Sequence, residues 1–195
     1  MLPATVGRRW QARSGERDPR RQLLADLVGR SPAAAPLQGD ERELLVAFLD
    51  WHRQTFELKC AGVPHERLSE KGIPPSGLSL HGLLRHLTGV ERWWFRQQFA
   101  GEDVPMIYYS DDDPYQDFDA LDGDVEEALT LWRSECDRSR EIVAAASSLD
   151  QTGTLVRSGE TFSLRRLLLY LSAEYARHNG HADLLRERID GRTGH

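Results

Sequence analysis

The spacing of apolar residues along four long segments is the feature that most constrains the fold of this chain. In each segment, apolar side chains recur every three to four positions, which is the period of an α-helix with one face turned to a core. The four expected helices span about residues 40–60, 80–99, 124–147 and 164–188. No convincing strand pattern competes with them, although residues 150–162 could form a small hairpin at Gly153 or Gly159. An all-α four-helix bundle is therefore the expected fold class.

Polar residues that suit helix N-caps stand directly before these segments: Asp40, Ser79, Asp124 and Ser163. A side-chain oxygen at such a position accepts a hydrogen bond from a backbone N–H that the first helical turn leaves free. Glu43 lies three residues after Asp40 and completes the pattern of a capping box. Gly101 and Gly191 are placed to end the second and fourth helices, so local chemistry sets the segment boundaries.

The N-terminal residues 1–38 differ from the rest of the chain because they lack sustained periodicity and contain four prolines. Residues 1–30 carry seven arginines against three acidic residues. A short helix over about 20–28 is one option within this stretch. We expect a basic, flexible N-terminal arm over 1–38 and a single bundle domain over 39–192.

Charge and cysteine usage exclude several functional classes. The formal net charge of −6 and the pI near 5.7 argue against a nucleic-acid-binding surface over the whole domain. No apolar run approaches the ~20 residues that a membrane span requires. Cys60 and Cys136 lie 76 residues apart without a CxxC motif, which favours a reduced, cytoplasmic setting over a disulfide framework. We therefore expect neither nucleic acid nor membrane as a partner.

The last expected helix carries polar residues where its core-facing stripe should be apolar. At 100° per residue, one face collects, within about 60° to either side, Leu167, Tyr170, Leu171, Glu174, His178, His181 and Leu185. A carboxylate and two imidazoles thus occupy core-facing positions at i, i+4 and i+7. Because an unpaired buried carboxylate is strongly destabilising, Glu174 requires a partner.

His86 is the matching anomaly on the second helix, where it shares an apolar face with Leu83 and Trp93. Inward-facing polar residues on two facing helices are how metal sites are built in helical bundles. His86, Glu174 and His178 would supply three protein ligands and leave one coordination position for water or substrate. We expect Zn²⁺ at this site, with Ni or Fe as alternatives. The same ligands also suit non-haem iron, so the type of ligand alone does not identify the metal.

Two alternatives stay open at this level. His181 could be a fourth ligand or a group that acts beside the ligands. Arg177 could instead neutralise Glu174 in a purely structural Glu–His–Arg network. A carboxylate-bridged di-iron site is excluded, because it needs Glu-x-x-His on two helices, whereas three residues separate Glu174 from His178 and no second copy exists.

Other candidates are weaker. His52 and His81 could approach the mouth of such a site, although surface positions are the commoner expectation for both. Cys60 has no sequence neighbour that would lower its pKa, and Cys136 is expected in the core. The acidic, aromatic-rich loop over 101–122 is long for a plain connection and is expected to cover a site.

Two segments, LLRHLTGVERWW over 83–94 and EYARHNGHADLLRE over 174–187, resemble the second and last helices of the DinB/YfiT-like superfamily of bacterial four-helix metalloproteins. The similarity is greatest to the subgroup called mini-circle proteins. It covers about residues 38–192 and leaves out the arginine-rich arm. The resemblance implies a bundle whose helices run in the order up-down-down-up.

The resemblance also implies a ligand set. Members commonly use one histidine on the second helix and His-x-x-x-His on the last. Here Glu174 stands at the first of those last two positions, as in the mycothiol-dependent maleylpyruvate isomerase branch, and His178 stands at the second. His181 falls where many members have glutamine, which ranks it below His86, Glu174 and His178.

The activity that the resemblance implies is that of a divalent-metal-binding S-transferase or isomerase that depends on a low-molecular-weight thiol such as mycothiol. A small-molecule thiol and an electrophilic substrate are then the expected partners. His181 and Arg177 are the expected catalytic residues, which would orient the cofactor or move protons. The alternative is a non-catalytic, metal-stabilised bundle that binds a small molecule or a partner. A homodimer is left open.

Overall fold

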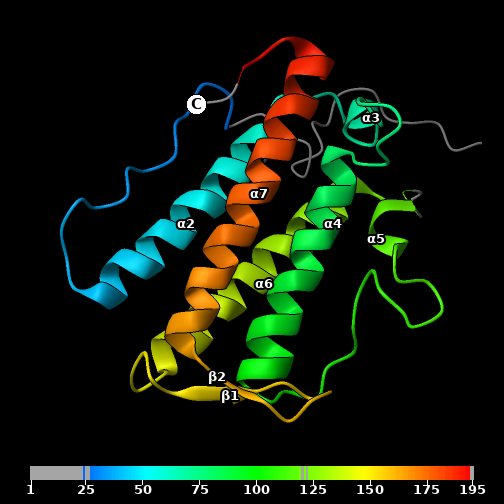
Figure 1. Ribbon diagram of the computed structural model, residues 1–195. Coiled ribbons are helices and arrows are strands. Elements are labelled where there is room, and N and C mark those ends of the chain that lie inside the picture. The colour runs from blue at the N-terminus through cyan, green and yellow to red at the C-terminus, as the bar shows by residue number, and fades with distance from the viewer. Residues whose placement is uncertain (1–23, 25–26, 120, 122, 194–195) are drawn as a thin grey trace, which may run out of the picture.

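The computed structural model describes residues 24, 27–119, 121 and 123–193, and their fold is mostly helical (Figure 1). The long helices lie side by side and are α2 (Glu41–Cys60), α4 (Leu80–Glu91), α6 (Val125–Ala145) and α7 (Leu164–Asp190). A π-helical segment, η1 (Arg92–Phe99), extends α4 without a break. In Figure 1, α2 and α7 rise, whereas α4 and α6 descend. The expectation of a mainly α-helical protein is confirmed.

The helix boundaries follow the predicted caps. Asp40 and Glu43 form the expected capping box at the start of α2. Side chains also cap the other long helices at their N-termini, where Ser79, Asp124 and Ser163 each accept a backbone hydrogen bond. Helix α7 ends at Gly191, which has a φ of 77° and therefore adopts the left-handed conformation that glycine tolerates best.

Four short elements connect the long helices: α3 (His65–Leu68), α5 (Gln116–Asp119), β1 (Thr152–Thr154) and β2 (Thr161–Ser163). The sequence allowed the hairpin as an option but did not indicate α3 or α5. Strands β1 and β2 pair antiparallel, with Gly153 opposite Phe162. A Cβ atom at Gly153 would come within 2.6 Å of the Phe99 Cα, so the close approach of the hairpin to η1 requires glycine at this position.

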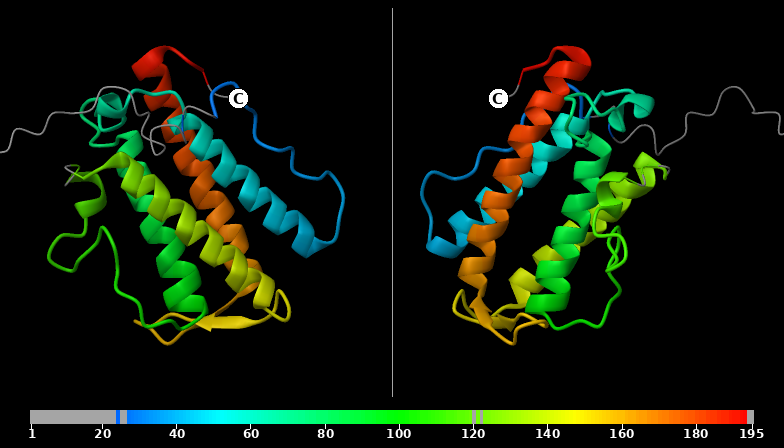
Figure 2. Two further views of the ribbon diagram at one scale, coloured as in Figure 1. Left: turned by 180° about the vertical axis from the view of Figure 1, so that it is seen from behind. Right: turned by 45° about the vertical axis from the view of Figure 1, so that its right-hand side comes forward.

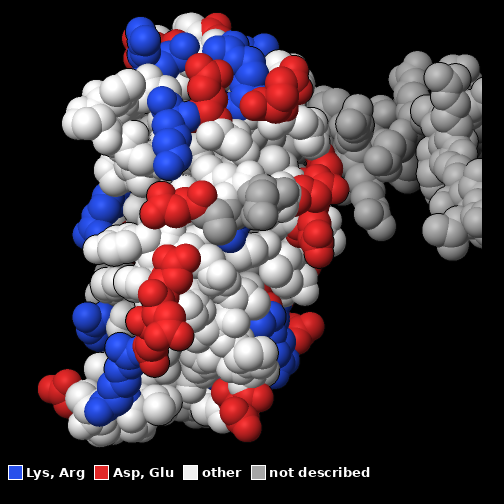
Figure 3. Space-filling view, turned by 90° about the vertical axis from the view of Figure 1, so that its right-hand side faces the viewer, with Lys and Arg blue, Asp and Glu red and all other residues white. Residues whose placement is uncertain are grey.

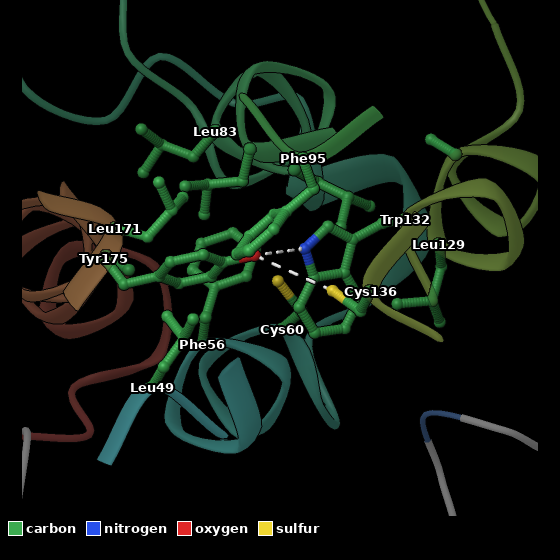
Figure 4. Packing of buried hydrophobic residues seen from close by; sticks show 14 of the residues in the cluster. Leu49, Phe56, Cys60, Leu83, Phe95, Leu129, Trp132, Cys136, Leu171 and Tyr175 are labelled. Atoms are coloured by element: carbon green, nitrogen blue, oxygen red, sulfur yellow. Dashed lines mark hydrogen bonds between the residues drawn. The ribbon is translucent and has the colours of Figure 1, made fainter. Parts of the chain in front are cut away.

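The helices pack in pairs around one core. Helix α2 lies along α7, and α4 lies along α6, an arrangement on which Figures 1 and 2 agree. All four contribute to the buried cluster that Figure 4 shows, in which Phe56, Phe95, Leu129 and Tyr175 are fully buried. The predicted apolar stripes therefore meet in a single interior.

A polar network crosses this core. The Arg53 side chain on α2 donates two hydrogen bonds to Glu91 on α4, with Nε–Oε1 at 2.8 Å and Nη2–Oε2 at 2.7 Å. The Tyr175 hydroxyl on α7 donates to Glu91 Oε1 at 2.7 Å and accepts from Trp132 Nε1 on α6 at 3.0 Å. The sulfur of Cys136 lies 3.7 Å from the same hydroxyl (Figure 4). Side chains from all four long helices thus meet at one buried carboxylate.

The N-terminal arm is described only in part. Residues 27–38 run beside α2 in Figure 1, and the backbone N–H of Ala33 donates to Gln54 Oε1 at 2.9 Å. Leu24 is buried and packs against the core. Most of the predicted helix over 20–28 lies outside the described residues, and the division into an arm over 1–38 and a bundle over 39–192 stays a prediction. None of the described helices is long and apolar enough to cross a bilayer.

Replacing Glu91 with glutamine should lower the free energy of unfolding by roughly 3–5 kcal/mol, because the buried Arg53 guanidinium loses the carboxylate that compensates its charge. Urea denaturation followed by circular dichroism measures the change. Glu41→Gln is the matched control, since Glu41 also accepts two hydrogen bonds from one arginine, Arg165, but at the surface. Exposed pairs contribute little, so an equal loss in both variants would contradict the role of burial.

Candidate metal centre

Helices α4 and α7 bring together the three residues that the sequence singled out. One ligand atom from each of His86, Glu174 and His178 lies within 4.8 Å of the others. The Nε2 atoms of His86 and His178 lie 3.4 Å and 3.1 Å from the same oxygen, Glu174 Oε1. Glu174 and His178 are one turn apart on α7, and His86 faces them from α4 with its ring centroid 4.7 Å from that of His178. Two long helices therefore fix the cluster from both sides.

The cluster is mostly shielded from solvent. Side-chain exposure is 8% for Glu174, 9% for His178 and 25% for His86, so the opening lies on the His86 side. Hydrogen bonds from His178 and His86 hold the pKa of Glu174 well below its usual range, against the opposing effect of burial. Burial by itself would lower the pKa of His86, but its hydrogen bonds to Asp117 and Glu174 raise that pKa to about 9. The carboxylate is thus held ionised between two imidazoles.

The donor set fits a divalent cation. Two imidazole nitrogens and one carboxylate oxygen converge from separate directions, which is the three-ligand arrangement of open metal sites. In the protein alone, both imidazoles turn toward a single carboxylate oxygen. A cation among the three groups would replace these contacts with three metal–ligand bonds, after the proton on each facing nitrogen has left. Among the described residues, no other group of three or more such side chains converges in this way.

Asp117 and Phe118, on the short helix α5, complete the surroundings of His86. The Nδ1–H of His86 donates to Asp117 Oδ2 at 2.8 Å, and the Phe118 ring stacks on the imidazole with centroids 5.3 Å apart. A carboxylate on the second ring nitrogen fixes the tautomer and orientation of a ligating histidine. A Cβ atom at Gly82 would come within 3.0 Å of Phe118, so glycine there lets α5 approach α4.

The sequence did not mark Asp117 or Phe118 as site residues, although Phe118 counts among the aromatic residues of the loop over 101–122. The only signal was the acidic, aromatic loop over 101–122, which was expected to cover a site. In the structure, Arg85 holds this loop against α4, because its Nη2 donates to Gln116 O at 2.9 Å and its guanidinium lies 4.3 Å from the centre of the Tyr108 ring. Figure 3 shows acidic side chains gathered in patches on the face that α5 occupies in Figure 1.

Arg177 and His181 flank the cluster without joining the three converging ligand atoms. Arg177 is 63% exposed at its side chain, and its Nη1 donates to Glu174 Oε2 at 3.0 Å. The Nδ1 atom of His181 lies 3.3 Å from His178 Nδ1 and so faces the far side of that ring from Glu174. Burial, His178 and Arg177 lower the pKa of His181, in that order.

The weaker candidates do not belong to the group of converging ligand atoms. His52 and His81 are buried, so the expectation of surface positions was wrong; Asn179 contacts His52 and Ser69 contacts His81. Burial raises the pKa of the Cys60 thiol to about 12. Cys136 lies in the core, as expected, and both cysteines are free.

Comparison with protein families places the chain in a known family. A model of the family described as Mycothiol-S-transferase matches residues 44–191. This range contains all four long helices except the first three residues of α2 and includes the three clustered side chains. No curated protein and no solved structure matches the chain significantly.

Asp117→Asn should weaken Zn²⁺ binding by roughly 10- to 100-fold, because His86 loses the charged acceptor that orients it. Competition against a chromophoric chelator gives the dissociation constant. Asp119→Asn is the matched control, since Asp119 lies on the same short helix but is 65% exposed and near Lys71. A Zn²⁺ affinity that drops equally in both variants would point to the loss of acidic charge in general instead of orientation of His86.

Proposed function

The chain belongs to the mycothiol S-transferase family, and from that premise we propose that it is a divalent-metal-dependent enzyme that transfers the sulfur of mycothiol to an electrophilic substrate. The observation that carries the proposal is the convergence of His86, Glu174 and His178 from two helices, which brings one ligand atom of each to within 4.8 Å of the others. An S-transferase needs a thiolate at neutral pH, and a site of this composition can provide it.

A bound Zn²⁺, or Ni²⁺ or Fe²⁺ in its place, would stabilise the thiolate form of a coordinated sulfur and so raise the fraction of nucleophile near pH 7. His86, Glu174 and His178 would hold the ion and leave a position open to the thiol. Glu174 would also offset part of the ion's positive charge. Asp117 would keep Nδ1 of His86 protonated, so that Nε2 is the atom offered to the metal.

The roles of Arg177 and His181 are part of the proposal. His181 contacts His178 and is partly exposed, so its place suits a group that receives the thiol proton and passes it to solvent. Arg177 holds Glu174 by its second oxygen, which limits rotation of the carboxylate, and its exposed position lets it contact a bound reactant.

The transfer itself needs no further cofactor. The thiol S–H bond breaks and its proton leaves by way of His181, while the sulfur lone pair forms a new S–C bond to the electrophile. In a substitution, the bond to the leaving group breaks and its electron pair departs with that group. The loop over 101–119 lies against α4 beside His86, where it would cover the electrophile and limit the access of water.

Family membership favours this function over the alternative of a non-catalytic, metal-stabilised binding bundle. We also assign the long helices to the up-down-down-up bundle of the DinB/YfiT-like superfamily, which is supported by α2 and α7 rising while α4 and α6 descend in Figure 1.

The parent protein, purified without an affinity tag, should contain nearly stoichiometric divalent metal, and His86→Ala and His178→Ala should each lose it while staying folded. Elemental mass spectrometry and circular dichroism make these measurements. His65→Ala is the matched control, because His65 contacts Glu126 outside the cluster. A parent that remains metal-free after supplementation with zinc, nickel and iron would overturn the proposed metal centre.

Metal-loaded parent should accelerate the reaction of mycothiol with monobromobimane, in which bromide leaves, whereas His86→Ala should reduce this rate to the uncatalysed level. Catalysis is measured as the rate of mycothiol consumption with the protein minus the rate without it. A folded, metal-loaded parent that gives no acceleration with this or other activated electrophiles would favour the binding-module alternative.

Cys60→Ser should retain nearly the full rate of transfer, because a buried thiol whose pKa is raised to about 12 is not a nucleophile at neutral pH. Initial rates with mycothiol and monobromobimane measure the effect, and thermal unfolding shows whether the variant is intact. Loss of activity in a folded, metal-loaded variant would show that the protein's own thiol takes part.

A further inference from the structure

A cavity lies near the N-terminal end of α7, about two turns before the candidate metal ligands. It has a volume of about 460 Å³ and opens between η1 and the β-hairpin. Its lining combines the apolar residues Trp94, Leu155 and Phe162 with the polar residues Glu160, Thr161, Ser163 and Arg166. Neither the metal centre nor the proposed transfer step uses any of these residues.

Aromatic rings form one wall of this region and continue toward the metal centre. The Trp94 and Tyr170 rings lie with centroids 4.7 Å apart, and the Arg166 guanidinium lies 5.8 Å and 5.1 Å from their respective centres. Tyr170 is one turn before Glu174 on α7. Burial raises the pKa of the Tyr170 phenol, and the nearby Glu174 raises it further.

The polar groups of the cavity retain hydrogen-bonding capacity for a ligand, although Ser163 caps α7 and Glu160 Oε2 accepts from Ser158 Oγ at 2.9 Å. Among the residues that the structure describes, Arg166 takes part in no ion pair, and its guanidinium is exposed. The cavity offers a cationic donor in Arg166, an anionic acceptor in Glu160, and hydroxyl groups that can do either. An anionic ligand would meet repulsion from Glu160, whereas a neutral polyol can satisfy donors and acceptors together.

We propose that this cavity binds the polyhydroxylated part of the thiol cofactor, with a sugar-like ring against Trp94 and Tyr170 and its hydroxyl groups on Arg166 and Glu160. Mycothiol joins its cysteine to an amino sugar and an inositol, so most of its surface consists of ring C–H and hydroxyl groups. Aromatic faces pack against the C–H side of such rings, while planar charged side chains bind adjacent hydroxyls in a bidentate manner.

The distances suit this arrangement. Arg166 precedes Glu174 by eight residues on α7, which is about 12 Å along a helix axis. A cofactor whose sulfur lies at the metal centre can therefore extend past Tyr170 and place its rings in the cavity. The inference rests on the proposed function, because it assumes that the sulfur end of the ligand lies at His86, Glu174 and His178.

Calorimetric titration of the metal-loaded, full-length protein tests the proposal with three probes: mycothiol, the same glycoside without its cysteine, and N-acetylcysteine. Arg166→Gln should raise the dissociation constants of mycothiol and of the thiol-free glycoside by roughly tenfold or more, as expected for the loss of charge-assisted hydrogen bonds. The dissociation constant of N-acetylcysteine should change by less than about twofold, since that ligand reaches only the metal.

Arg165→Gln is the matched control, because Arg165 is the adjacent arginine but pairs with Glu41 and Asp150. Trp94→Leu gives a second test, and retained metal content and thermal unfolding temperature show that each variant is intact. Unchanged mycothiol affinity in Arg166→Gln and in folded Trp94→Leu would overturn the cavity assignment while leaving the proposed function in place. A parent that binds none of the three probes despite bound metal would instead count against the proposed function.

Discussion

The buried carboxylate of Glu91 is the constraint on which the rest of the structure depends. Arg53, Tyr175 and Cys136 contact it, and Trp132 contacts it through Tyr175, so every long helix is tied to one point. Apolar packing is non-directional and would tolerate small shifts between helices, whereas these hydrogen bonds are directional. Because Tyr175 is next to Glu174 and Glu91 lies five residues after His86, the network sets the register in which the metal ligands face each other.

The metal centre is also linked to the loop that covers it. His86 contacts Glu174 through one ring nitrogen and Asp117 through the other. The imidazole therefore joins the core of the bundle to the loop over 101–119, which Arg85 holds against α4. Placing a carboxylate on each side of His86 favours donation from both nitrogens, which explains why the pKa of this residue is raised to about 9 despite its burial. The orientation of His86, a candidate metal ligand, and the position of the loop over 101–119 thus depend on each other.

Along α7, groups of three kinds follow one another from its N-terminal end. Arg166 and Tyr170 near the N-terminus border a cavity of mixed polarity. Glu174 and His178 follow and form the candidate metal centre with His86 of α4, and His181 lies beyond them. Since residues three to four positions apart lie close together on a helix, a single element can align the proposed ligand recognition, metal binding and proton transfer in one direction. Because the chain belongs to the mycothiol S-transferase family, this order agrees with the proposed placement of mycothiol along α7.

The sequence by itself determined the long helices, their caps and the three clustered residues, because helical periodicity and capping depend on neighbours a few positions apart. For the same reason, the sequence showed that His86, Glu174 and His178 interrupt apolar helix faces. Only the tertiary structure decided that Asp117 and Phe118 meet His86, that Arg53 pairs with Glu91, and that His52 and His81 are buried. These contacts join residues far apart in the chain, and Asp117 lies on α5, a short helix that the sequence did not indicate. No local spacing encodes such contacts, because they arise when packing of the helices brings separate segments into reach.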